Sequence, residues 1–200
     1  MVKRGLLLLL VAIASSLPVT AQTQPGPPLI PPERAADSYQ IYSLLMPGQV
    51  FASMDNGKPW AISAITVNED DMNPRLAPDA MLNPPQEHAH AFKEAVADFY
   101  QRKKERFRLV QNLQLNRSYV LLSPAEGEQL KASKVSPAAS SSLRSTYGDY
   151  VGITYFSEVY FNTKQTAALV YMLDWCGNLC SQAQWVYLEK HNGTFMRILI

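Results

Sequence analysis

The last quarter of the chain decides the fold: residues 152–200 read GITYFSEVYFNTKQTAALVYMLDWCGNLCSQAQWVYLEKHNGTFMRILI. Aromatic and β-branched residues dominate this stretch, which is typical of β-strands. Turn signals divide it into four predicted strands, at residues 152–161, 165–174, 184–190 and 194–200. The Asn192-Gly193 pair is the strongest hairpin signal in the chain. The pattern therefore predicts an antiparallel β-meander.

Two shorter apolar runs lie upstream of this stretch, and both are predicted strands. Residues 60–67 alternate in part and are rich in β-branched side chains, and residues 119–122 read YVLL. Residues 68–85 are polar and rich in proline, so we expect a long irregular connection there.

Three segments carry helical patterns. Residues 35–45 have apolar side chains close to the helical period. A long helix is predicted after Pro85, and its apolar face consists of Phe92, Ala95, Val96 and Phe99. Ser123 and Glu126 form a capping box at the start of a short helix over residues 124–132. Residues 135–145 are rich in Ser and Ala and are expected to form a mobile loop.

The order of these elements indicates the fold class. Helices come mainly before strands, which is typical of α+β proteins. We predict a single α+β domain over residues 35–200, in which the C-terminal antiparallel β-meander packs against one long helix and shorter helices.

The N-terminus has the three parts of a secretory signal peptide. Two basic residues precede an apolar run at residues 5–17, and small or β-branched residues then predict cleavage before Gln22. The run is shorter than the roughly 20 residues that span a bilayer. We therefore expect residues 1–21 to be removed and the mature chain to be extracytoplasmic, in the periplasm or secreted, without a membrane contact. Residues 22–34 follow as a Pro-rich segment, expected to be an extended tether.

Charge argues against one class of partner. Lys3 and Arg4 leave with the signal peptide, so 16 of the 18 basic residues remain against 17 acidic residues, a formal charge of −1. A nearly neutral chain has no electrostatic attraction to nucleic acid or anionic lipid. We therefore expect no nucleic-acid partner.

Two cysteines, Cys176 and Cys180, lie in the turn between the second and third strands of the meander. Outside the cytoplasm an even number of cysteines favours a disulfide. Free or redox-active thiols and a metal site are the alternatives. A tetrahedral metal site needs four ligands, and the sequence near this loop supplies two.

The C-terminal residues also carry a family resemblance. Phe161-Asn162 is followed by residues 166–171 (TAALVY), then by residues 176–180 (CGNLC) and residues 187–193 (YLEKHNG). These motifs resemble a group of uncharacterised exported bacterial proteins with the pattern F-N-x-x-x-T-x-A-L-V-Y, C-G-x-L-C and L-E-K-x-x-G-x-W. The chain departs from it at Ser181, where glycine is usual, and at Phe195, where tryptophan is usual. The resemblance implies the fold and export, and no activity.

Aromatic side chains crowd the meander. Because alternate strand residues face opposite sides of a sheet, one face could expose several rings, and exposed rings suit contact with a glycan or a protein. The alternative is that helices cover these rings. The candidate binding residues are Tyr155, Tyr160, Tyr171, Trp175, Trp185 and Tyr187.

Other polar clusters do not match known sites. His88 and His90 are two residues apart at a predicted helix start, so they point to nearly opposite sides and cannot chelate one ion. The acidic run at residues 69–71, with Asn68 and Asn73 beside it, could offer oxygen ligands to Ca²⁺, but it lacks the calcium-loop pattern. We therefore expect no metal and no cofactor.

The absence of a recognisable catalytic motif favours a non-enzymatic domain. We predict that it binds a protein or a glycan through the sheet face and the Cys176–Cys180 loop. Two alternatives stay open. One is an extracytoplasmic hydrolase that uses Glu87, His88 or Asp149, and the other is a redox or metal role for the cysteine loop.

Overall fold

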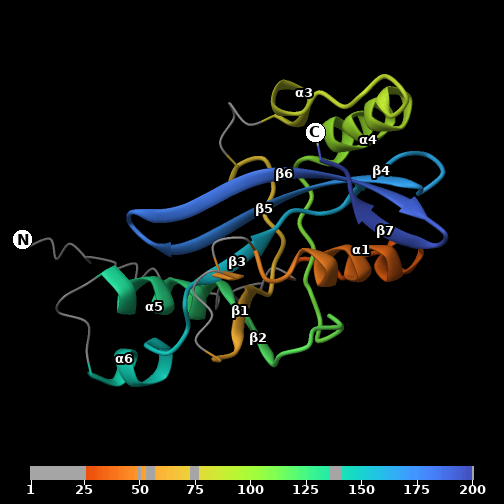
Figure 1. The fold of residues 1–200 in the computed structure, drawn as a ribbon. Coiled ribbons are helices and arrows are strands. Elements are labelled where there is room, and N and C mark those ends of the chain that lie inside the picture. The colour runs from red at the N-terminus through yellow and green to blue at the C-terminus, as the bar shows by residue number, and fades with distance from the viewer. Residues whose placement is uncertain (1–25, 49–50, 53–56, 73–76, 136–140, 200) are drawn as a thin grey trace, which may run out of the picture.

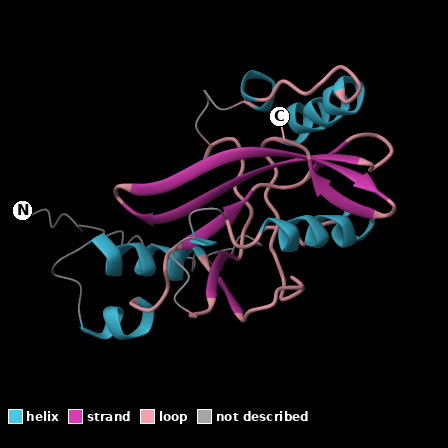
Figure 2. Ribbon diagram, in the orientation of Figure 1, coloured by secondary structure: helices cyan, strands magenta, loops and turns pink. Residues whose placement is uncertain are grey.

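The computed structural model of the chain describes residues 26–48, 51–52, 57–72, 77–135 and 141–199. This part is a mixed α+β fold, in which helices lie on both faces of one seven-stranded sheet (Figures 1 and 2). The predicted signal peptide and the Pro-rich segment as far as Pro25 lie outside the described residues. In the described ranges, no helix is long and apolar enough to cross a membrane.

The strand order of the sheet is β2-β1-β3-β5-β6-β7, and β4 also pairs with β5. The strands are β1 (Trp60–Ser63), β2 (Tyr119–Leu122), β3 (Ile153–Phe156), β4 (Tyr160–Phe161), β5 (Ala167–Gly177), β6 (Cys180–His191) and β7 (Thr194–Arg197). Each predicted strand region contains a strand. The predicted turn joins β6 to β7, with φ of 50° at Asn192 and 83° at Gly193, as a tight hairpin requires.

The prediction of an antiparallel sheet holds for its C-terminal part only. The pairs β3–β5, β4–β5, β5–β6 and β6–β7 are antiparallel, whereas β1 runs parallel to both β2 and β3. Parallel neighbours need a crossover connection of a dozen or more residues, and the helical segment between β1 and β2 supplies one. Local strand patterns do not specify which distant strands pair, so the parallel part was not predicted.

Two helices cover the centre of the sheet. α1 (Pro32–Leu45) packs on one face, where the rings of Tyr42 and Phe156 stack at 4.8 Å. α4 (Ala89–Arg102) packs on the other face through the four predicted apolar residues, all of which are buried. Each helix has 14 residues. Among the described residues there is therefore no single dominant helix, because two helices of equal length pack on opposite faces.

The remaining helices are short. α5 (Pro124–Val135) starts with the predicted capping box, since the backbone N–H and the hydroxyl of Ser123 both donate to Glu126 Oε2, at 2.8 and 2.7 Å. α3 (Pro78–Met81) interrupts the predicted irregular connection. α6 (Ser141–Tyr147) occupies part of the predicted loop, where Tyr147 packs into a cluster with Leu130. Residues 136–140 of that loop lie outside the described ranges.

The residues just before α1 belong to the domain. The side chain of Ile30 is buried in the core, and the backbone N–H of Arg108 donates to the Pro28 carbonyl at 2.7 Å. The domain therefore starts before residue 35, because packing and backbone hydrogen bonds hold the described end of the expected tether against it.

A buried ionic cluster joins both large helices to the segment between β3 and β4. Glu158 is 1% exposed and forms ion pairs with Arg34 of α1, at 3.4 Å, and with Arg102 of α4. Arg34 also donates to the Val159 carbonyl at 2.6 Å and to Asp98 at 2.7 Å. Burial raises the pKa of Glu158 to about 8, although Arg102 acts in the opposite direction.

Candidate functional site

A cleft of about 340 Å³ lies between the sheet and α5, and we call it the α5 cleft. It is lined by Ser63, the last residue of β1, and by Ser123, which directly follows β2. Both residues mark carboxyl ends of parallel strands, and ligands of open sheets with parallel strands bind in the crevice outside these ends. The position of the cleft makes it the candidate binding site.

The floor of the α5 cleft is a strip of the sheet. It consists of Ile153 and Tyr155 from β3 and of Tyr171, Leu173 and Trp175 from β5. Side chains two residues apart share one face of a strand, and the register places Tyr155 opposite Leu173 and Ile153 opposite Trp175. This is the face that α4 covers further along. The rings of Tyr155 and Trp175 stay half-buried in the cleft.

One wall of the cleft is the face of α5 that carries Gly127, Glu128 and Lys131. Lys131 Nζ lies 5.2 Å from the centroid of the Tyr155 ring and 6.0 Å from that of Trp175. It also donates to Glu128 Oε1 at 2.9 Å. Burial lowers the pKa of Lys131, but hydrogen bonds with Glu128 and Tyr155 outweigh it, and the net pKa is raised. The amine is therefore a protonated cation above an aromatic floor.

The opposite wall includes residues 65–67, Asp71 and Arg106. Arg106 Nη2 donates to Asn68 Oδ1 at 3.1 Å and lies 2.9 Å from Asp71 Oδ2. Each wall thus carries one ion pair. The cleft combines hydrogen-bond donors and acceptors with no excess of either charge.

The acidic run beside this wall is neutralised by basic residues that follow α4. Glu69 lies 2.6 Å from Lys103, and Asp70 lies 2.6 Å from Lys104. Lys104 also hydrogen-bonds Asp70 and lowers the pKa of that carboxyl. Within the described ranges, no group of three or more His, Cys, Asp and Glu side chains could hold a metal ion.

The serines of the cleft are held in local turns. The hydroxyl of Ser63 donates to the Ile65 carbonyl at 2.7 Å, and that of Ser123 donates to Glu126. A serine nucleophile needs an adjacent base. The described carboxylates and amine of the lining, Asp71, Glu128 and Lys131, are engaged in ion pairs.

The six predicted binding aromatics do not form one exposed face. Tyr160, Tyr171, Trp185 and Tyr187 are buried. The reason is that α4 covers them: the Phe99 ring lies 5.2 Å from Tyr160 and 5.1 Å from Trp185. The other two, Tyr155 and Trp175, lie in the α5 cleft, which Tyr171 also lines.

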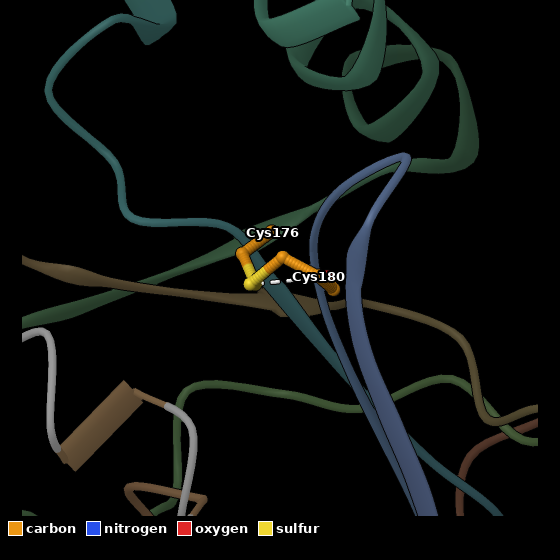
Figure 3. The surroundings of a disulfide bond; sticks show 2 residues. All are labelled: Cys176 and Cys180. Atoms are coloured by element: carbon orange, nitrogen blue, oxygen red, sulfur yellow. Dashed lines mark hydrogen bonds between the residues drawn. A yellow bond between two sulfur atoms is a disulfide. The ribbon is translucent and has the colours of Figure 1, made fainter.

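The predicted disulfide is confirmed. Cys176 and Cys180 are bonded at the end of the β5–β6 hairpin, with a Cα–Cα distance of 5.1 Å (Figure 3). Both cysteines of the chain are therefore occupied. So short a loop gains about 2 kcal/mol in the chain-entropy model, so the bond fixes local shape more than global stability.

The residues named for a hydrolase make separate contacts. His88 Nδ1 lies 2.8 Å from Glu189 Oε1, which also accepts the Tyr187 hydroxyl at 2.5 Å. Asp149 pairs with Lys58 at 3.1 Å, and Glu87 is exposed. The contact between His88 and Glu189 ties the start of α4 to β6, and Asp149 has a different partner.

Lys131 and Arg106, the two cations of the cleft, were not identified from the sequence. Each is an ordinary basic residue in a polar segment, and its place depends on strands distant in sequence. The available signal was Gly127, which lies four residues before Lys131 on the same helix face. A glycine inside a helix is less favourable than alanine by about 1 kcal/mol, which draws attention to that helix face.

Comparisons with known proteins give no relative for this chain. No protein-family model, no curated protein and no solved structure matches it. The resemblance to exported bacterial proteins therefore stays a prediction, and function is argued from the site alone.

Proposed function

We propose that this chain is an exported, non-enzymatic domain that binds a glycan in the α5 cleft, beside the Cys176–Cys180 loop. The half-buried rings of Tyr155 and Trp175, set between two charged walls, carry the proposal. The C–H face of a sugar ring packs on aromatic rings, and its hydroxyls need donors and acceptors at the edge. The ion pairs of the two walls supply both kinds of group.

The shape of the site favours a glycan over a protein partner. Its aromatic floor is recessed in a cleft of about 340 Å³, within the range of small-molecule sites. A stable protein interface needs about 800 Å² on each partner, which calls for a broad exposed surface. Here α4 covers most of the aromatic residues that would have formed one.

Export is supported by the disulfide and by the predicted signal peptide. Disulfides persist in oxidising compartments and are rare in the cytosol. The bond between Cys176 and Cys180 is consistent with a chain that matures outside the cytoplasm.

Isothermal titration calorimetry of the mature domain tests the binding proposal. Cellotetraose, chitotetraose and maltotetraose serve as probes. We expect at least one to bind, and we expect Trp175→Ala to weaken that binding at least tenfold, about 1.4 kcal/mol. Tyr100→Ala is the matched control, because Tyr100 is an exposed aromatic on α4 outside the cleft lining.

Two results would reject a saccharide ligand. One is the absence of heat from all three tetrasaccharides. The other is equal affinity of the wild-type protein and Trp175→Ala for a probe that binds.

A further inference from the structure

We infer that the Cys176–Cys180 disulfide is a positioning device for the α5 cleft: it holds Trp175 in the orientation that completes the floor. This inference rests on the proposed function for its consequence in binding. Its structural content, the fixed orientation of one ring, can be measured without a ligand.

Trp175 and Cys176 point to opposite faces of the hairpin. Consecutive strand residues alternate in direction, and the contacts follow this rule. Trp175 packs with Ile153 and Tyr155 at the α5 cleft, whereas Cys176 packs against the core cluster under α1. The disulfide therefore restrains the backbone of Trp175 from behind and does not obstruct the cleft.

The strand pairing is irregular at this point. Trp175 pairs with Ser181, and the register then shifts before Gly177 pairs with Cys180. Gly177 has φ of +143°, a conformation that side-chain-bearing residues rarely adopt. On the other side of β5, the last residue paired with β3 is Trp175 itself, opposite Ile153. The ring thus sits where regular pairing ends.

Packing restrains Cys176 but not the two residues at the centre of the tip. Asn178 is exposed, and Leu179 is 103% exposed. After the register shift, the pairing of Gly177 with Cys180 and the covalent bond between Cys176 and Cys180 close the hairpin. Loss of the bond would let the two strand ends separate and release the Trp175 ring from the floor.

The test compares the wild-type protein with the Cys176→Ser/Cys180→Ser double variant by acrylamide quenching of tryptophan fluorescence. Trp175→Phe in each background isolates the Trp175 signal from Trp60 and Trp185, which are buried. We expect the quenching constant of Trp175 to rise at least twofold without the disulfide, and the Trp60 and Trp185 signals to stay constant. Reduction of the folded wild-type protein with dithiothreitol is the second route to the same state if the variant does not fold.

The control is Asn178→Ala/Leu179→Ala, which alters the tip and keeps the bond, and it should leave the quenching constant unchanged. Unchanged quenching of Trp175 after loss of the disulfide would overturn the positioning role, whatever the domain binds. A rise in quenching without tetrasaccharide binding by the wild-type protein would retain the positioning role and reject the glycan proposal alone. Where a tetrasaccharide binds, its affinity should fall at least fivefold without the bond.

Discussion

The guanidinium of Arg34 lies 2.7 Å from the carboxylate of Asp98, so α1 is tied to α4 although the two helices pack on opposite faces of the sheet. Arg34 Nη2 also lies 3.4 Å from Oε1 of buried Glu158. Removal of one partner from a buried ion pair leaves an uncompensated charge, which typically costs 3–5 kcal/mol. We expect Arg34→Met to lower the free energy of unfolding by about 3 kcal/mol in urea denaturation.

Lys104→Met provides the comparison for Arg34→Met. Lys104 pairs with Glu69 and Asp70 at the surface and its side chain is 63% exposed. Exposed ion pairs contribute about 1 kcal/mol or less. Equal losses of stability in the two variants would contradict a special contribution of the buried cluster.

The stability that Asp174 contributes to the domain should fall as the pH rises from about 4. Burial raises the pKa of Asp174 to about 6, although the Thr154 hydroxyl, which donates to it at 2.8 Å, acts in the opposite direction. The folded chain therefore keeps a proton that an unfolded aspartate releases near pH 4. Stability from this group is present below that pH and is lost as the pH rises through about 6. Burial also raises the pKa of Glu158, to about 8, so the stability that this protonated side chain contributes is lost as the pH rises towards 8.

Asp174→Asn removes the titrating group but keeps an acceptor for Thr154. We expect its free energy of unfolding to fall less than that of the wild type between pH 4 and 7, by up to about 3 kcal/mol for a shift of roughly two pKa units. Urea denaturation at each pH measures the difference, with Asp79→Asn, an exposed aspartate, as the control. An Asp174→Asn profile as steep as the wild-type profile would show that another group is responsible.

Gly152 should tolerate no side chain. A Cβ there would lie 2.0 Å from the Trp175 carbonyl oxygen and 2.9 Å from Cys176 Cα, both backbone atoms. We expect Gly152→Ala to lower the thermal midpoint, with a loss of about 2–3 kcal/mol from overpacking. Gly127→Ala is the matched change, since its Cβ would meet Ile153 Cδ1 at 3.4 Å, a permitted contact. That variant should gain up to about 1 kcal/mol from helix propensity.

Lys131 should contribute to ligand binding from above the floor. Lys131→Met removes a donor and the cation near the Tyr155 and Trp175 rings. We expect tetrasaccharide affinity to fall about tenfold, since a lost hydrogen bond to a charged group costs on the order of 1.5 kcal/mol. Calorimetry of Lys134→Met, one turn along α5 and outside the cleft lining, should match the wild type. If Lys134→Met weakened tetrasaccharide binding and Lys131→Met did not, the ligand would bind outside the α5 cleft.

Much of the local structure followed from the sequence because its signals are local. The aromatic and β-branched composition and the Asn192-Gly193 turn identified the C-terminal strands, and the spacing of Phe92 and Phe99 identified the buried face of α4. The capping box fixed the start of α5 at Pro124. The helix α6 was missed, because the support that Tyr147 receives from Leu130 is tertiary.

The candidate site was predicted only in part. Two of its floor residues, Tyr155 and Trp175, were among the aromatics chosen from the sequence. Periodicity placed these rings on one face of the sheet but did not show which part of that face α4 covers. The tertiary structure decided this, because the parallel pairing of β1 with β2 and β3 brings α5, Lys131 and Arg106 to the uncovered part.

The sequence by itself determined the strands, the helix faces and the disulfide, since each depends on neighbours within a few residues. The position and lining of the α5 cleft were decided only by the tertiary structure, because its floor and walls come from segments up to about a hundred residues apart.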